Sequence, residues 1–269
     1  MQPRILILRA PGTNCDAETA HAFQLAGGQT DVLHVRRLLG APRLLADYQV
    51  FCIPGGFSYG DDIASGRIFG IQLQNRLAEV MQEFKDAGKL ILGICNGFQV
   101  LVKCGLLSPD DPKSDPAMTL AWNTSGKFEA RWVNLAVDGN RCVLLTGIES
   151  MYVPIKHGEG RFVARDATTL AELDRRGQLA LRYSAPQLGE LASDGAECDL
   201  ARPLPYPENP NGAQANVAGV CDPTGRILGL MPHPELHVDP QHHPRWSRGE
   251  AGKTGDGLLL FQNAVAYFR

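Results

Sequence analysis

Short hydrophobic runs and longer segments of helical period alternate over the first 107 residues. Continuous apolar runs are typical of parallel strands buried on both faces, whereas apolar residues three or four positions apart indicate helices with one buried face. The strands predicted from such runs are Arg4–Ala10, Thr30–Leu38, Tyr48–Gly56 and Leu90–Cys95. The helices predicted from such spacing are Asn14–Leu25, Ile68–Lys89 and Asn96–Leu107. Asn14 or Asp16 is expected to cap the first helix with its side-chain oxygen.

The second half of the chain has shorter β-rich segments, separated by loops that are rich in proline. Its predicted strands are Lys127–Val137, Cys142–Ile148, Tyr152–Ala164, Leu179–Ala185, Asn216–Asp222 and Arg226–Glu235. The last two are expected to form a hairpin, and Gly255–Arg269 a C-terminal amphipathic helix. The whole pattern predicts an α/β fold: a doubly wound, mostly parallel sheet flanked by helices, with an added β-rich portion in the second half. Residues 1–269 are interpreted as a single domain, because no repeat or low-complexity linker divides them.

Composition and charge narrow the classes of function. Lysine and arginine number 26 and aspartate and glutamate 29, so the formal net charge of −3 argues against a nucleic-acid or anionic-membrane partner. No apolar run approaches the roughly 18 residues of a membrane span, and the N-terminal run lacks a signal-peptide cleavage pattern. Seven cysteines without a C-x-x-C pair favour free thiols over disulfides or a zinc site. The chain is therefore predicted to be cytoplasmic.

Cys95 lies where a predicted strand meets a predicted helix, in the sequence Gly93-Ile94-Cys95-Asn96-Gly97. A nucleophile between small residues at such a sharp turn is typical of a nucleophile elbow, which holds the side chain out above the sheet. The start of a helix also favours a thiolate, and its free N–H groups can bind an oxyanion. The alternative is a small buried residue before a tight turn, so the interpretation depends on a base elsewhere in the chain.

A candidate base and its orienting group are His233 and Glu235, in the sequence Pro232-His233-Pro234-Glu235. A residue before proline is pushed toward extended geometry, in which positions i and i+2 project to the same side. Glu235 is therefore expected to hold the imidazole while His233 faces the thiol. The order Cys, His, Glu then gives a nucleophile, a base and an orienting group. A His-x-Glu pair by itself is more often structural, and here it indicates a catalytic pair only in combination with Cys95.

Gly55 and Gly56 follow a predicted strand directly, in the sequence Ile53-Pro54-Gly55-Gly56. Glycines at this place let backbone N–H groups approach a ligand closely. The N–H groups of Gly56 and Asn96 are therefore predicted to form an oxyanion hole. The alternative is an ordinary turn.

These three features together resemble the class I, triad-type glutamine amidotransferases. The matching phrases span nearly the whole chain and are RAPGTNCDAE, IPGGFSYGDDIASG, LGICNGFQVL, NTSGKFEARW, PIKHGEGRF, YPENPNGA and GLMPHPE. GGFSYGD and GICNGFQ are the most specific of them, and they resemble glutaminase subunits that serve purine biosynthesis. The resemblance implies that Cys95 attacks the carboxamide of L-glutamine to form a thioester. It also implies that His233 protonates the departing ammonia and then activates water, while Glu235 orients His233.

The resemblance further implies substrate contacts and a partner. The residues expected to contact glutamine are Gly55, Phe57, Gln99, His157, Gly158 and Glu159. The ammonia would pass to a synthase subunit, with or without a small third subunit, in an ATP-dependent C–N ligase complex. ATP and Mg²⁺ are expected on that partner, so this chain is expected to hold no cofactor and no metal. Two departures are Leu236, where family members often have arginine, and the additional segments 108–118 and 190–206.

Two further patterns and two other functions are alternatives. Gly252-Lys253-Thr254 has the ending of a phosphate loop, but Ser247 stands where that pattern needs glycine. Three histidines, at 237, 242 and 243, could bind a metal, although their irregular spacing among prolines favours a surface loop. The other functions are a hydrolase or glutaminase of another pathway, and a non-catalytic sensor that keeps the elbow cysteine.

Overall fold

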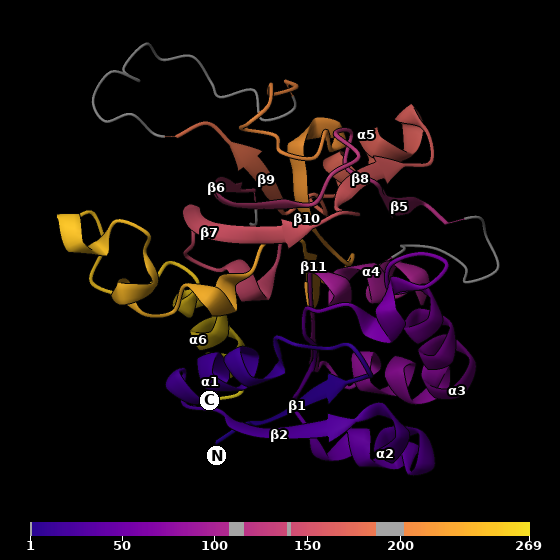
Figure 1. The fold of residues 1–269 in the computed structure, drawn as a ribbon. Helices are drawn as coiled ribbons and strands as arrows, with labels where there is room; N and C mark the ends of the chain where they lie inside the picture. The colour runs from indigo at the N-terminus through magenta and orange to yellow at the C-terminus, as the bar shows by residue number, and fades with distance from the viewer. Residues whose placement is uncertain (1, 108–115, 139–140, 187–201) are drawn as a thin grey trace.

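Five parallel strands form one half of a nine-stranded sheet (Figure 1). The structure, a computed structural model, describes residues 2–107, 116–138, 141–186 and 202–269. The parallel strands, in spatial order, are β2 (Gln29–His34), β1 (Arg4–Arg9), β3 (Val50–Ile53), β4 (Leu90–Ile94) and β11 (Ile227–Leu230). Because they run in one direction, the segments that follow them all leave the sheet at one edge.

The other half of the sheet is antiparallel and comes from the second part of the chain. Its strands continue from β11 as β10 (Val217–Cys221), β9 (Leu181–Ser184), β6 (Glu129–Val137) and β7 (Ser150–His157). A separate two-stranded sheet pairs β5 (Met118–Ala121) with β8 (Arg161–Ala164). The chain therefore extends a doubly wound sheet with an antiparallel β-rich portion, as the sequence predicted.

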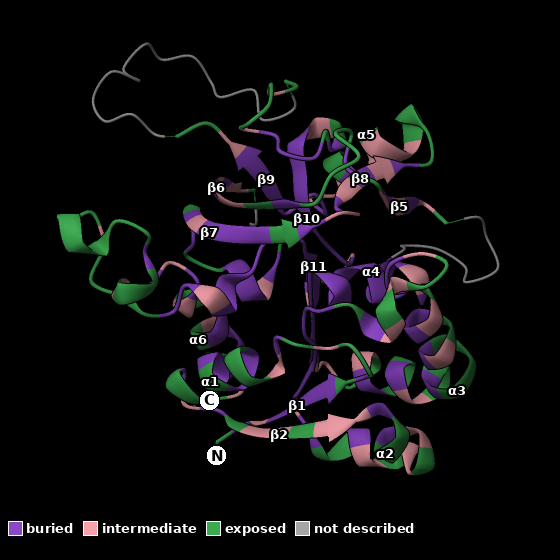
Figure 2. Cartoon of the chain, in the orientation of Figure 1, coloured by how far each residue is buried: buried purple, intermediate pink, exposed green. Residues whose placement is uncertain are grey.

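Helices cover both faces of the parallel strands (Figure 1). Helices α1 (Asp16–Leu25) and α6 (Leu258–Ala266) pack together on one face, and α3 (Arg67–Asp86) and α4 (Asn96–Lys103) on the other. Figure 2 shows the buried residues concentrated along the central strands and on the inner sides of these helices. The residues of β3 and β4 are all buried, which is why these strands read as continuous apolar runs.

Four local predictions were wrong. The strand predicted at Tyr152–Ala164 is divided between β7 and β8, which belong to different sheets. The strand predicted through Leu38 ends at His34, because the His34 side chain accepts a hydrogen bond from the Arg36 N–H and caps helix α2 (Val35–Gly40). The strand predicted at Cys142–Ile148 contains a short 3-10 helix, Val143–Leu145, and Asn263 of α6 donates to the carbonyl groups of Leu144 in this helix and Thr146 after it. The N-cap of α1 is Cys15, and no side chain there makes the expected capping bond.

Helix α5 (Ala167–Arg175) was missed by the sequence analysis. Asp166 caps it by accepting a hydrogen bond from the Thr169 N–H, and Leu173 is its single buried residue. Leu170 and Leu173 lie three positions apart and both pack on the core, so this spacing and the capping aspartate were the available signs.

The histidine-rich segment near the C-terminus is more buried than predicted. His237 and His243 are buried against Trp132 and Tyr152, and only His242 is exposed. Most of segments 108–118 and 190–206 lies outside the described residues. Within the described ranges, no helix is long and apolar enough to cross a lipid bilayer.

Candidate active site

Five segments far apart in sequence meet at the carboxyl edge of the parallel strands. They are Thr13–Cys15 after β1, Gly55–Phe57 after β3, Cys95–Asn96 after β4, His233–Glu235 after β11, and His157–Glu159 at the end of β7. The crossover topology brings these strand ends together, and the contacts below join the segments into one site.

Cys95 occupies a strained elbow between β4 and α4. Its backbone lies at φ 51° and ψ −105°, a region that residues with a side chain rarely adopt. The Cys95 N–H donates to the Leu230 carbonyl at 2.7 Å, so the strained residue is anchored to the neighbouring strand β11. The thiol itself lies 3.5 Å from the Lys156 carbonyl oxygen at the end of β7. The predicted sharp turn at Cys95 is therefore confirmed.

The glycines on either side of Cys95 are required by packing. A Cβ added to Gly97 would lie 1.9 Å from the Ile53 carbonyl oxygen of β3, and one added to Gly93 would lie 2.6 Å from the Gly97 carbonyl oxygen. Across the sheet, a Cβ on Gly229 would lie 2.1 Å from the Phe98 ring. Helix α4 thus starts in direct contact with three strands, and this contact fixes the direction in which Cys95 projects.

His233 and Glu235 form a buried pair. His233 Nδ1 lies 2.6 Å from Glu235 Oε1, and both residues are 2% exposed. The His233 N–H donates to the Pro154 carbonyl of β7 at 2.8 Å, which fixes the backbone at this point. The predicted extended geometry was wrong: His233 is kept out of the helical region but lies at φ −109° and ψ 83°, and Glu235 lies in a 3-10 helix, Pro234–Leu236, whose tight turn returns the carboxylate to the ring.

The electrostatics of the pair favour a protonated imidazole. Burial alone would lower the pKa of His233, but the Glu235 carboxylate and the Cys95 thiol outweigh burial, so this pKa lies well above its ordinary value. With Nδ1 held by Glu235, the other ring nitrogen Nε2 is buried and makes no hydrogen bond to the described residues. It is thus available to a reacting group.

The loop after β1 sets the orientation of the peptide that precedes Gly56. The Gly55 carbonyl accepts hydrogen bonds from the Asn14 and Cys15 N–H groups, at 3.3 and 3.2 Å. Because the trans peptide is planar, the Gly56 N–H points to the opposite side, away from this loop. The Asn96 N–H is the first of helix α4, and first-turn N–H groups have no acceptor within their own helix. Both donors predicted for the oxyanion hole are therefore available.

Asn96 and Gln99 connect the elbow to the two loops around it. The Asn96 amide accepts from the Ser58 N–H and donates to Asp61 Oδ1 and Gln99 Oε1. Gln99 Nε2 donates to the Glu159 carbonyl at 2.6 Å. In this structure Gln99 therefore holds the segment His157–Glu159 in place with the same amide that was predicted to contact glutamine.

The remaining residues predicted to contact glutamine lie in the segments that follow β3 and β7. Phe57 is 41% exposed and its ring contacts that of Phe128. Glu159 accepts from the Ser65 N–H through Oε2, and the Gly158 carbonyl accepts from the Asn123 N–H.

His157 is buried beside the His233 pair and is held by Asn123. Its Nδ1 lies 3.1 Å from Asn123 Oδ1, which also accepts from the Gly160 N–H, while Asn123 Nδ2 donates to the His157 carbonyl. Burial, with a smaller contribution from the positive charge of His233, lowers the pKa of His157 to about 3. His157 is therefore neutral at pH 7 and not solvated, which excludes an exposed β-turn at this position.

The low pKa of His157 predicts acid sensitivity. Below pH 6.5 the unfolded chain gains a proton at His157 that the folded chain does not take up until pH about 3. Stability is thus lost as pH falls through this window, by about 1.4 kcal/mol per unit from this residue. Urea unfolding of His157→Asn should show a pH slope between 6 and 4 that is smaller by about that amount, and the exposed control His21→Asn should keep the original slope. Equal slopes in all three proteins would contradict the assignment.

Asn123, Asn211 and Tyr183 belong to this network, although their sequence context predicted no role for them. Asn211 donates through Nδ2 to the Gly160 carbonyl and to the Tyr183 hydroxyl. Burial raises the pKa of Tyr183, and the Cys95 thiol adds to the rise. Asn123 and Asn211 lie in the sequences NTSG and NPNG, which are part of the resemblance to the family but indicate no role for either residue. Asparagine in a loop is usually a turn residue, so only the tertiary contacts distinguish these two.

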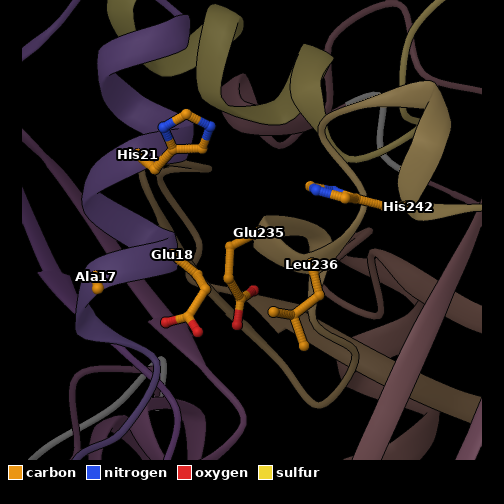
Figure 3. Close-up of a pocket in the computed structure, with 6 residues that line it drawn as sticks. All are labelled: Ala17, Glu18, His21, Glu235, Leu236 and His242. Atoms are coloured by element: carbon orange, nitrogen blue, oxygen red, sulfur yellow. The ribbon is translucent and has the colours of Figure 1, made fainter.

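A surface pocket of about 510 Å³ adjoins the triad on the side of α1 (Figure 3). It is lined by Ala17, Glu18, His21, Glu235, Leu236 and His242. Figure 3 shows the side chains of Glu18 and His21 on one wall and that of His242 on the opposite wall. Leu236, where the family often has arginine, therefore lies in a pocket wall and not at the Cys95 thiol.

Comparison with known proteins gives a consistent match over nearly the whole chain. Residues 2–268 match the family described as the CobB/CobQ-like glutamine amidotransferase domain. A relative from Dehalococcoides mccartyi, phosphoribosylformylglycinamidine synthase subunit PurQ, is 42% identical over 267 residues, which are 99% of this chain and 98% of the relative. The Methanococcus maripaludis protein of that name is 41% identical over 279 aligned residues, covering 100% of this chain and 99% of the relative. A chain in the structure of PurLQS from Thermotoga maritima superimposes with a TM-score of 0.72 at 30% identity, with both chains covered completely.

Proposed function

Because this chain belongs to the CobB/CobQ-like glutamine amidotransferase family and is similar over its full length to relatives named phosphoribosylformylglycinamidine synthase subunit PurQ, we propose that it is the glutaminase subunit of that synthase. It hydrolyses L-glutamine to glutamate and ammonia. The ammonia then converts formylglycinamide ribonucleotide into its amidine on a synthase subunit, in purine biosynthesis. The observation that carries the proposal is the buried His233–Glu235 pair beside an elbow cysteine in a chain of this family.

Acylation begins at the Cys95 sulfur. The thiolate attacks the carboxamide carbon of glutamine, and the carbonyl oxygen becomes an oxyanion that the N–H groups of Gly56 and Asn96 stabilise. A single donor of this kind contributes about 10²- to 10³-fold to kcat in acyl-transfer enzymes. The protonated imidazole of His233, favoured by its raised pKa, donates a proton to the leaving nitrogen as the C–N bond breaks. Ammonia leaves and a thioester remains on Cys95.

Deacylation uses the same groups, but His233 now accepts a proton where it donated one before. Neutral His233 removes a proton from water, which attacks the thioester carbonyl, and the same two N–H groups hold the second oxyanion. The tetrahedral intermediate then releases glutamate and restores the Cys95 thiolate. Glu235 stabilises the imidazolium in both halves of the cycle and fixes which ring nitrogen faces the substrate.

The partner follows from the energetics of the second reaction. Formation of the amidine consumes ATP, so we place ATP and Mg²⁺ on the synthase subunit, which receives the ammonia with or without a small third subunit. The relatives are named as subunits, and the similar Thermotoga maritima chain lies in a PurLQS structure.

The test is reconstitution of the chain with its synthase subunit, in the presence of ATP, Mg²⁺ and formylglycinamide ribonucleotide. Glutamate and amidine are expected in equal amounts, and the isolated chain should turn over glutamine slowly, because free hydrolysis wastes ammonia. Glutamate formation without amidine would favour a glutaminase of another pathway. Full-rate hydrolysis by the isolated chain, unaffected by the partner, would contradict the proposed coupling.

Replacement of Glu235 by glutamine is expected to lower glutamine-dependent kcat by about 10²- to 10⁴-fold, because the imidazolium loses its stabilising charge and its fixed tautomer. The charge of Glu235 makes the largest contribution to raising the pKa of His233, so this pKa should fall in Glu235→Gln. The alkaline limb of the kcat/KM profile should therefore move to lower pH. The exposed control Glu79→Gln, on α3, should change neither quantity, and an unshifted alkaline limb in Glu235→Gln would contradict the orienting role.

A further inference from the structure

Cys15 places a second thiol beside the triad, and the mechanism above gives it no task. One ligand atom from each of Cys15, His233 and Glu235 lies within 4.8 Å of the other two, and all three residues are buried. Cys15 is held firmly, because its N–H donates to the Gly55 carbonyl and its own carbonyl accepts from the Thr19 N–H and hydroxyl. The thiol is therefore fixed next to the pair.

The carboxylate of this cluster has an unpaired oxygen. Glu235 Oε2 is fully covered and makes no hydrogen bond to any residue in the described ranges. The Glu235 side chain is 0% exposed and that of His233 2%. A buried carboxylate oxygen without a hydrogen bond is costly, and a bound cation would compensate it.

We propose that Cys15, His233 and Glu235 form a binding site for a soft divalent cation, Zn²⁺ in particular, and that the bound ion reversibly inhibits the enzyme. Thiolate, imidazole and carboxylate are the donors that zinc takes in proteins, at about 2.0–2.3 Å. Tetrahedral geometry at those bond lengths implies ligand atoms about 3.3–3.8 Å apart, so shifts of about 1 Å complete the site. Binding releases the proton of the Cys15 thiol, and water fills the fourth position.

The ion would inhibit because two of its ligands, His233 and Glu235, are groups that catalysis uses. This part of the inference rests on the proposed function. A metal ion on a His233 nitrogen takes the lone pair that must accept a proton from water, or displaces the proton shared with Glu235. An ion on Glu235 also neutralises the charge that stabilises the imidazolium. Either arrangement removes the base while leaving the Cys95 elbow and the glutamine contacts in place.

The pocket behind Glu235 offers the ion a route of approach. Glu18, His21 and His242, all exposed, line this pocket together with Glu235 (Figure 3). Carboxylate and imidazole groups bind divalent cations weakly when they stand apart, so they would raise the local concentration of Zn²⁺ next to the buried site.

The test measures Zn²⁺ binding to the full-length chain by competition with a chromophoric chelator, in wild type and in three cysteine variants. Wild type and Cys95→Ser are expected to bind one Zn²⁺ with similar Kd, because the site does not depend on Cys95. Cys15→Ser should bind at least about 100-fold more weakly, a larger loss than the tenfold to hundredfold of an outer-shell partner. Cys104→Ser, which removes a buried thiol elsewhere, should bind like wild type.

A Kd unchanged in Cys15→Ser, or binding lost only in Cys95→Ser, would overturn the proposal, as would the absence of stoichiometric binding. In the assembled synthase, inhibition by Zn²⁺ should weaken about 100-fold in Cys15→Ser, each protein being compared with its own glutamine-dependent rate in metal-free buffer. The chelator measurement needs no turnover. It therefore separates failure of this site from failure of the proposed glutaminase activity.

Discussion

Replacement of Cys95 by alanine is expected to reduce the glutamine-dependent activity of the assembled synthase by at least about 10⁴-fold. The thiol forms the covalent bond to the substrate, and loss of a nucleophile in comparable hydrolases costs about 10⁴- to 10⁶-fold in kcat. With ammonium chloride in place of glutamine, the same variant should make amidine at the wild-type rate, because free ammonia bypasses this site. Initial rates with the two nitrogen donors give the comparison directly.

The matched control is Cys104→Ala, which removes a buried thiol from the end of helix α4. It should retain both activities, so a general effect of cysteine loss can be excluded. If Cys95→Ala leaves glutamine-dependent turnover unchanged, the triad assignment is wrong, and the alternative of a non-catalytic elbow-cysteine sensor returns. If both activities fall together, the variant has damaged the complex and not the chemistry.

Replacement of Gly97 by alanine is expected to destabilise the fold by about 3 kcal/mol or more. The added Cβ would lie 1.9 Å from the Ile53 carbonyl oxygen, a backbone atom of a central strand that cannot rotate away. Overpacking in a core usually costs 1–3 kcal/mol, and rigid backbone contacts lie at the upper end. The gain in helix propensity from glycine to alanine, about 1 kcal/mol, offsets only part of it. Urea unfolding, read as the shift in midpoint at constant m, measures the difference.

Gly40→Ala is the control for this change. Gly40 is the last residue of helix α2, and an added Cβ there meets nothing within 4 Å. Its unfolding free energy should stay within about 1 kcal/mol of wild type, on the stabilising side if it changes. A Gly97→Ala protein as stable as Gly40→Ala would show that α4 can move away from β3, and the rigid elbow would have to be abandoned.

The parts of the site that sequence predicted well are those built from local rules. The strained turn at Cys95 follows from a nucleophile between glycines at a strand end, and Pro234 keeps the backbone at His233 out of the helical region. Both depend on neighbours within two or three positions in the chain. The pairing of His233 with Glu235 is local in the same sense, although a 3-10 turn and not an extended strand brings the carboxylate to the ring.

The parts that sequence reasoning missed depend on contacts between distant segments. Asn123 and Asn211 look like ordinary loop asparagines, and only the fold shows that they hold His157 and the carbonyl of Gly160. Gln99 was predicted as a substrate contact, and its bond to the Glu159 carbonyl crosses 60 positions. No local pattern predicts such pairs, because the fold brings together segments that are far apart in the sequence.

The sequence by itself determined four strands of the parallel half of the sheet and the elbow, and it predicted the residues proposed here as nucleophile, base and orienting group. The spacing of hydrophobic residues and the positions of glycine and proline affect the backbone nearby, so the local structure can be predicted from the sequence. Only the tertiary structure decided which carbonyls anchor the site, why His157 is neutral, and that Cys15 lies beside His233 and Glu235. The physical reason is that burial and charge at one residue depend on groups brought from other strands, and burial is a property of the folded chain alone.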